Sequence, residues 1–152
     1  EGLMRIGLYS EAGRRAVVRA RGLIAARGLA PDAHGIRAAR AEVRKDPQLE
    51  HLARNEDFFS MSGCRDLLFH VQEHRLTVPR LAESLERLGL EFLGFDALGN
   101  DAAAKYRARF TDDAPMRDLA NWDAFERDHP DTFAGMYQFW VRKPPQKERG
   151  QQ

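Results

Sequence analysis

The chain has 152 residues, of which 43% are hydrophobic and 31% charged, and its formal net charge is +1. This composition fits one globular domain with a hydrophobic core, and the small net charge gives no argument for nucleic-acid or membrane binding. A single cysteine, Cys64, excludes an internal disulfide and a cysteine-based zinc cluster, and it suits a reducing compartment. No apolar run approaches the ~18 residues needed to cross a bilayer, and no signal peptide is recognisable. A cytoplasmic location is therefore predicted.

The chain begins with an expected strand that is followed by three expected helices. Residues 3–9, Leu-Met-Arg-Ile-Gly-Leu-Tyr, predict a strand whose side chains alternate between two faces. Ser10 is expected to cap the first helix. Pro31 and Asp32 predict the start of a second helix, and Pro47 predicts the start of a short third one. Because their apolar stripes are thin, these helices are expected to cover another element rather than to form a core of their own.

The remainder of the chain predicts helices that alternate with two further strands. The periodicity of residues 55–75 is ambiguous and is interpreted as short helix and loop. Thr77 and Gly89 bracket a clear helix, and a strand over 90–95 follows it directly. Two helices and a last strand are expected at 101–110, 116–128 and 136–143. The polar residues 145–152 are expected to form a disordered tail.

This order of elements is typical of an α/β fold. A strand, a long helical crossover and a second strand predict that the second strand runs parallel to the first, and the whole predicts a small sheet of three strands. The first strand would leave an apolar edge unpaired, so self-association through residues 3–9 is expected. The aromatic residues of the last third are expected in the core and on the sheet. They are Trp122, Phe125, Phe133, Tyr137, Phe139 and Trp140.

The segment 55–75 is the densest in side chains with chemical potential, among them Arg65 and Asp66. Within it lies the run His70-Val71-Gln72-Glu73-His74. It matches the H-x-x-E-H pattern of zinc peptidases, in which two histidines on one helical face bind Zn²⁺ and the glutamate acts as a base. In a second interpretation His70, Glu73 and His74 line a substrate pocket, where a histidine could accept a proton near neutral pH. In a third, they cap helices and bond to the backbone.

Other candidate residues lie at the end of the first strand and in the middle of the chain. Tyr9 and Ser10 occupy the carboxyl end of the strand, where open α/β sheets bind ligands, so Tyr9 is a further candidate for substrate binding. Ser10 is equally well explained as a helix cap. Phe58 and Phe59 are either core residues or walls of a pocket.

Six segments share the pattern of one known family. They are GLMRIGLYS (2–10), SGCRDLLFH (62–70), EHRLT (73–77), GLEFLGF (89–95), WDAFE (122–126) and DTFAGMYQFW (131–140). Together they resemble the C-terminal part of class I S-adenosylmethionine-dependent methyltransferases, especially those of bacterial proteins that also carry tetratricopeptide repeats. The resemblance extends over about residues 2–144.

The resemblance implies a partial Rossmann-like methyltransferase sheet. In that family the strand order is 3-2-1-4-5-7-6, with strand 7 antiparallel. Residues 3–9, 90–95 and 136–143 then resemble strands 5, 6 and 7, which are neighbours in the order 5-7-6. The resemblance also implies that residues 1–144 are the C-terminal portion of a methyltransferase domain, in which 10–75 form an enlarged helical insertion that acts as a substrate lid.

The cofactor-binding signature of the family has no counterpart in the chain. That signature is a glycine-rich turn after strand 1, followed by an acidic residue at the end of strand 2. The segment 89–94 does not match it, because it follows a helix instead of preceding one. The resemblance therefore implies a fragment, inactive alone, of a parent that binds S-adenosylmethionine through a missing upstream half. The methyl acceptor is not identified, and two rivals stay open: a protein-interaction module built on helices of 10–60, and a zinc hydrolase.

Overall fold

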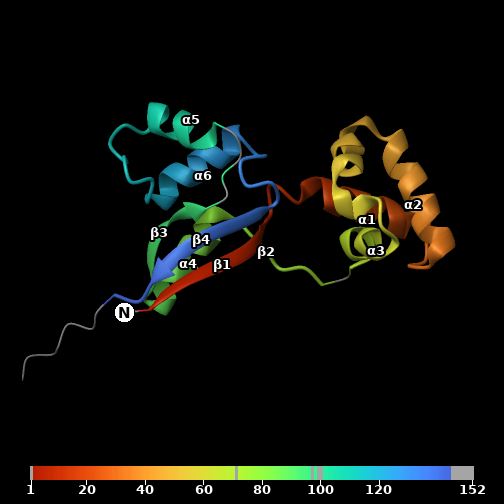
Figure 1. Ribbon diagram of the computed structural model, residues 1–152, viewed down its shortest axis with the longest axis horizontal. Helices are drawn as coiled ribbons and strands as arrows, with labels where there is room; N and C mark the ends of the chain where they lie inside the picture. Colours follow the sequence, from red (N-terminus) through yellow and green to blue (C-terminus); the bar gives the residue numbers. More distant parts are fainter. Residues whose placement is uncertain (1, 71, 97, 99–100, 145–152) are drawn as a thin grey trace, which may run out of the picture. The chain divides into compact units, whose positions relative to one another are not determined.

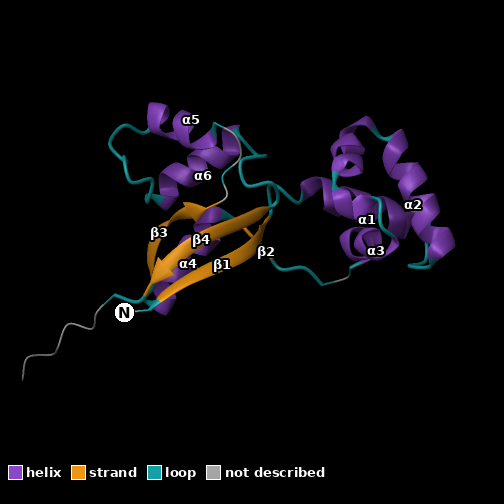
Figure 2. Cartoon of the chain, in the orientation of Figure 1, coloured by secondary structure: helices purple, strands orange, loops and turns teal. Residues whose placement is uncertain are grey.

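A computed structural model describes residues 2–70, 72–96, 98 and 101–144. The chain folds into two compact units. Unit 1 combines the N-terminal segment up to Gly13 with the chain from His74 onward, and unit 2 comprises Arg14–Glu73. Unit 1 contains the sheet, whereas unit 2 is helical (Figure 1, Figure 2). The tail that was expected at 145–152 lies outside the described residues.

Unit 1 is built on a mixed sheet of four strands in the order β2-β1-β4-β3. The strands are β1 (Leu3–Ser10), β2 (Arg75–Leu76), β3 (Glu91–Asp96) and β4 (Met136–Arg142). β4 runs antiparallel to both of its neighbours, and β2 runs parallel to the end of β1. The predicted α/β class is confirmed. The expectation of three strands is wrong by one, because a two-residue strand has no periodicity that a sequence pattern could reveal.

Helices of unit 1 pack on one face of this sheet. They are α4 (Val78–Leu88), α5 (Ala102–Arg109) and α6 (Leu119–Asp128). The side chains of β4 alternate accordingly: Tyr137, Phe139 and Val141 are buried in the core, while Trp140 lies on the opposite face and is 40% exposed. The six aromatic residues predicted for the core and the sheet therefore divide between the two: five are buried, and Trp140 lies on the sheet face away from the core.

The boundaries of α4 and α6 follow from local capping. Thr77 accepts a hydrogen bond from the backbone N–H of Arg80, and Gly89 ends α4 in the left-handed conformation with φ 62°, as the sequence predicted. α6 starts three residues later than the predicted 116, because the Asp118 side chain caps it by accepting bonds from the N–H groups of residues 120 and 121. Met116 instead has φ 55°, outside any helix.

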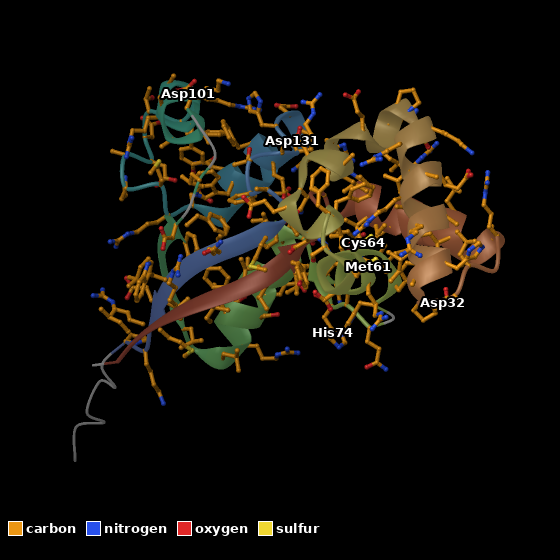
Figure 3. All side chains as sticks on the ribbon, turned by 45° about the vertical axis from the view of Figure 1, so that its right-hand side comes forward. Asp32, Met61, Cys64, His74, Asp101 and Asp131 are labelled. Carbon is orange, nitrogen blue, oxygen red and sulfur yellow. The ribbon has the colours of Figure 1, made fainter. Side chains whose placement is uncertain are left out.

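Unit 2 is a bundle of short helices with its own core. The helices are α1 (Arg15–Ala26), α2 (Ala33–Lys45), the 3₁₀ turns η1 (Pro47–Arg54) and η2 (Glu56–Phe58), and α3 (Met61–Phe69). The apolar stripes of these helices meet at residues that are fully buried, among them Ile36, Leu49, Phe58 and Cys64. Figure 3 labels Cys64 among the helices of this unit. The expectation that these helices merely cover another element is therefore wrong, because several thin stripes together enclose one core. Among the described residues, no helix could span a membrane.

The predicted helix cap at Ser10 is wrong, because a turn separates β1 from α1. β1 extends through Ser10, a turn follows, and α1 begins only at Arg15 with no side-chain cap. Ser10 is fully buried instead of standing at a helix terminus. In contrast, Asp32 caps α2 as expected, because its carboxylate accepts a bond of 2.8 Å from the N–H of Gly35.

Candidate functional site

A buried polar network lies at the carboxyl end of β1. The Ser10 hydroxyl donates to Oε1 of Glu126 at 2.7 Å, and the Tyr137 hydroxyl donates to the same carboxylate at 2.7 and 2.9 Å. Glu126, on α6, is only 6% exposed, and the other two residues are fully buried. A buried carboxylate is costly unless hydrogen bonds satisfy it, and these hydroxyl groups do so. The network joins β1, α6 and β4.

The network also orders the turn that leaves β1. The N–H of Gly13 donates to the Ser10 hydroxyl at 3.0 Å. A Cβ at Gly13 would lie 2.5 Å from the Cα of Gly135, so the two backbones touch. Burial, together with the hydrogen bond to Glu126, raises the pKa of the Tyr137 hydroxyl far above its ordinary value, so that it stays a donor. In open α/β sheets this strand end is where ligands bind, and here hydrogen bonds and a close backbone contact hold it.

Glu73, the last residue of unit 2, binds two arginine side chains. Its carboxylate receives two bonds from Arg14, at 2.6 and 3.1 Å, and lies 3.1 Å from Nη2 of Arg21. The Glu73 side chain is 3% exposed. Burial alone would raise the pKa of Glu73, but the two guanidinium groups hold it below its usual range. Because Arg14 and Glu73 are the first and last residues of unit 2, their bidentate pair fastens the two ends of the unit together.

Removing the charge of Glu73 is expected to weaken unit 2. The Glu73→Gln variant should lose about 1–3 kcal/mol of unfolding free energy at pH 7, because two half-buried guanidinium groups lose their anion. A carboxyl with a depressed folded pKa contributes stability above its unfolded pKa, near 4.5, and that stability disappears as the pH falls through the folded value. The difference between variant and parent should therefore be full at pH 7 and shrink below about pH 4.

Urea unfolding followed by far-ultraviolet circular dichroism at pH 7 and pH 3 measures this difference. Glu50→Gln is the matched control, since Glu50 is 68% exposed in its pair with Arg54 and should matter little. A deficit of Glu73→Gln that is the same at both pH values would contradict the charged clamp.

A groove of about 680 Å³ runs along one face of α3. Its lining is Pro31, Ser62, Arg65, Asp66, Phe69, His70 and Gln72. The spacing of 62, 65, 66 and 69 places four of these side chains on one helical face. Within the described part of the chain, the side chains of Arg65, Asp66 and His70 make no hydrogen bond or ion pair with one another or with other residues. Polar groups of both charges thus surround an apolar wall, which is the usual make-up of a small-molecule site.

The four predicted substrate residues do not gather in one unit. Tyr9, half-buried, pairs with Arg75 and Met136 in the sheet of unit 1, and exposed His74 belongs to the same unit. His70 and Glu73 belong to unit 2, where His70 lines the groove and Glu73 binds arginines. Substrate binding by these residues stays a prediction.

The helix that a zinc site of the H-x-x-E-H type requires is not formed. α3 ends at Phe69, His70 is its C-cap, and residues 72–74 have no helical structure. The two histidines therefore do not occupy successive turns of one helix, and Glu73 is held by two guanidinium groups. Across the described ranges, no group of three or more His, Cys, Asp or Glu side chains is arranged to hold a metal ion.

A smaller cavity of about 350 Å³ lies in unit 1, beside the end of α6. Lys105, His129 and Asp131 contribute charged or titratable side chains to its wall, and Figure 3 marks Asp131 in the loop before β4. None of the predicted site residues lines this cavity.

Sequence reasoning missed Glu126 as a polar centre and Arg65 as a groove residue. The sequence did contain a signal for Glu126. It lies four residues after Trp122 and next to Phe125, on the buried face of α6, where a carboxylate is unusual. Arg65 was named among the chemically notable side chains of 55–75, but its place in the groove also depends on Pro31, which lies far away in the sequence.

Comparison with models of known protein families gives no match, and a search of curated proteins finds none either. The fold and the geometry of the two units therefore carry the functional argument.

Proposed function

We propose that the chain is the substrate-facing, C-terminal part of an S-adenosylmethionine-dependent methyltransferase. One observation carries the proposal: β4 lies between β1 and β3 and runs antiparallel to both. The methyltransferase family has this arrangement for its strands 5, 7 and 6, which the resemblance equates with the same three segments. The resemblance rests on sequence segments alone, so the strand order of the sheet supports the proposal separately.

Two further features support this proposal. Unit 2 leaves the sheet after β1 and returns to it at β2, which suits a lid inserted between strands of a larger domain. The edge of β1 opposite β4 is where the fourth strand of the family lies, and that strand would belong to the cofactor-binding half. S-adenosylmethionine would be bound by that half, and the methyl acceptor by the groove of unit 2.

In the groove, His70 would take a proton from the acceptor or align its nucleophilic atom, while Arg65 and Asp66 would orient charged groups. The apolar wall of Pro31 and Phe69 would hold the body of the acceptor. The acceptor expected from this lining combines an apolar portion with a charged group.

The coding sequence upstream of Glu1 provides the first test. It should encode a strand, a glycine-rich turn and a helix, then a strand that ends in an acidic residue. An upstream sequence without these elements would contradict the proposal. In the longer protein, His70→Ala should lower kcat/KM for the acceptor by about 10²-fold or more while the affinity for S-adenosylmethionine stays unchanged. His34→Ala is the matched control, because His34 is an exposed histidine of α2 outside the groove lining.

A protein-interaction module is the second candidate. It is favoured by one observation, namely that unit 2 has its own core and a bidentate clamp at its ends, as a self-contained binding unit would. Binding of candidate protein partners by this chain alone, without the upstream half, would favour the module over the lid.

A further inference from the structure

The last turn of α3 and the carboxylate of Glu73 are bridged by one guanidinium group. Arg21 lies on α1, which packs beside α3 in unit 2 (Figure 1). Its Nε and Nη2 donate to the carbonyl oxygen of Leu67 at 3.1 and 2.9 Å. The same Nη2 lies 3.1 Å from Oε2 of Glu73, and the Arg21 side chain is 16% exposed. Water therefore competes little for these charge-assisted bonds.

The bridge holds the chain on both sides of two groove residues. Leu67 belongs to the last turn of α3, where carbonyl groups have no partner within the helix and a cation is favourable. His70 leaves the helix with ψ 128°, and both His70 and Gln72 line the groove. Glu73 follows directly. Arg21 thus fixes the backbone before His70 and the side chain after Gln72.

The other end of α3 is held by different contacts. Nη2 of Arg40 donates to the carbonyl oxygen of Ser60 at 2.6 Å, and the Ser60 hydroxyl accepts a bond of 2.8 Å from the N–H of Gly63. The groove residues within α3 are placed by the helix itself. The influence of Arg21 on the groove is therefore expected to be local to the two lining residues that follow the helix.

We propose that Arg21 is a positioning residue of the groove, which orients the imidazole of His70 toward the bound molecule. Arg21 is not part of the groove lining, so it acts through the Leu67 carbonyl and through Glu73. This deepens the proposed function and rests on it for the role of His70 in methyl transfer. The bridge also explains why the buried carboxylate of Glu73 lies so close to the groove residues without lining the groove.

NMR relaxation of the backbone amides of the 152-residue chain tests the positioning. In the parent, the order parameters of residues 70 and 72 are expected near about 0.85, and in Arg21→Met they should fall below about 0.6 while those of α2 stay unchanged. The ring proton signals of His70 should shift as well. Methionine keeps the apolar stem that packs in unit 2. Arg19→Met is the matched control, because Arg19 lies on the same helix and pairs with Asp46, outside α3.

A second variant separates positioning from stability. Arg21→Lys keeps the charge beside Glu73, but lysine lacks the planar fork and its nitrogen ends one bond short of Nη2, so it reaches only one of the two acceptors. Unit 2 should stay folded, with a urea midpoint close to that of the parent, while the order parameters of residues 70 and 72 still fall.

Unchanged order parameters and unchanged His70 ring signals in folded Arg21 variants would overturn the positioning role. Unfolding of unit 2 in both variants would do the same, because Arg21 would then be purely structural. Neither result depends on the sequence upstream of Glu1. An upstream sequence without the glycine-rich turn would instead contradict the methyltransferase proposal and leave the measured order of residues 70 and 72 as it is.

Discussion

Phe58→Ala is expected to destabilise unit 2 by about 3–5 kcal/mol, whereas Phe59→Ala should change its stability by less than about 0.5 kcal/mol. Phe58 is fully buried where the helices of unit 2 converge, and the guanidinium groups of Arg40 and Arg44 lie 5.9 and 5.8 Å from the centre of its ring. Phe59 is 60% exposed. Truncation of Phe58 leaves a cavity that the short helices cannot close, whereas truncation of Phe59 leaves none.

The two units provide separate probes for this experiment. Both tryptophans, Trp122 and Trp140, belong to unit 1, so their fluorescence reports its unfolding. Far-ultraviolet circular dichroism includes the helices of unit 2. Phe58→Ala should shift the dichroism transition to lower urea while the fluorescence transition moves much less. If Phe59→Ala proved as damaging as Phe58→Ala, the described core of unit 2 would be wrong.

Gly35→Ala is the second substitution with a large expected effect. A Cβ at Gly35 would lie 2.0 Å from the carbonyl oxygen of Ala30 and 2.9 Å from its nitrogen, which are backbone atoms that a rotamer change cannot move. The loop that enters α2 must shift, at a cost of about 1–3 kcal/mol or more. Gly22→Ala, in the middle of α1, meets no atom within 4 Å. It should stabilise unit 2 by about 0.5–1 kcal/mol, because alanine favours a helix.

Urea unfolding of the two glycine variants by circular dichroism gives effects of opposite sign if the contact with Ala30 is real. The pair is well matched, since both glycines are helical, both lie in unit 2 and both receive the same methyl group. Stabilisation by Gly35→Ala would show that the chain at Ala30 does not approach α2 as described.

Local signals located several boundaries that depend on neighbouring residues, although the local Asp118 cap that starts α6 was missed. The caps at Asp32 and Thr77 and the left-handed Gly89 were predictable, because a cap needs only a side chain and an N–H group two or three positions away. The strands over 3–9, 90–95 and 136–143 were found within one residue at each end: the first from its alternation, the second from its place after Gly89 and the last from its aromatic and β-branched content. Ser10 shows where local reasoning fails. Serine favours a helix cap, but the Ser10 hydroxyl instead donates a hydrogen bond to the buried Glu126.

The candidate sites depended on contacts that no local pattern contains. His70 was singled out as chemically notable, but the groove that it lines also needs Pro31. The two arginines that neutralise Glu73 lie more than fifty residues away. The same holds for neighbours of identical type: only the packing of five helical segments decides that Phe58 is buried and Phe59 exposed.

By itself, the sequence determined the α/β class, most helix and strand positions and the absence of any cysteine pair, because these follow from periodicity, capping and composition. Only the tertiary structure decided that residues 14–73 enclose their own core and that Glu73 is a clamp instead of a free base. These features arise from burial and charge pairing between residues far apart in the chain, and such interactions exist only once the chain has folded.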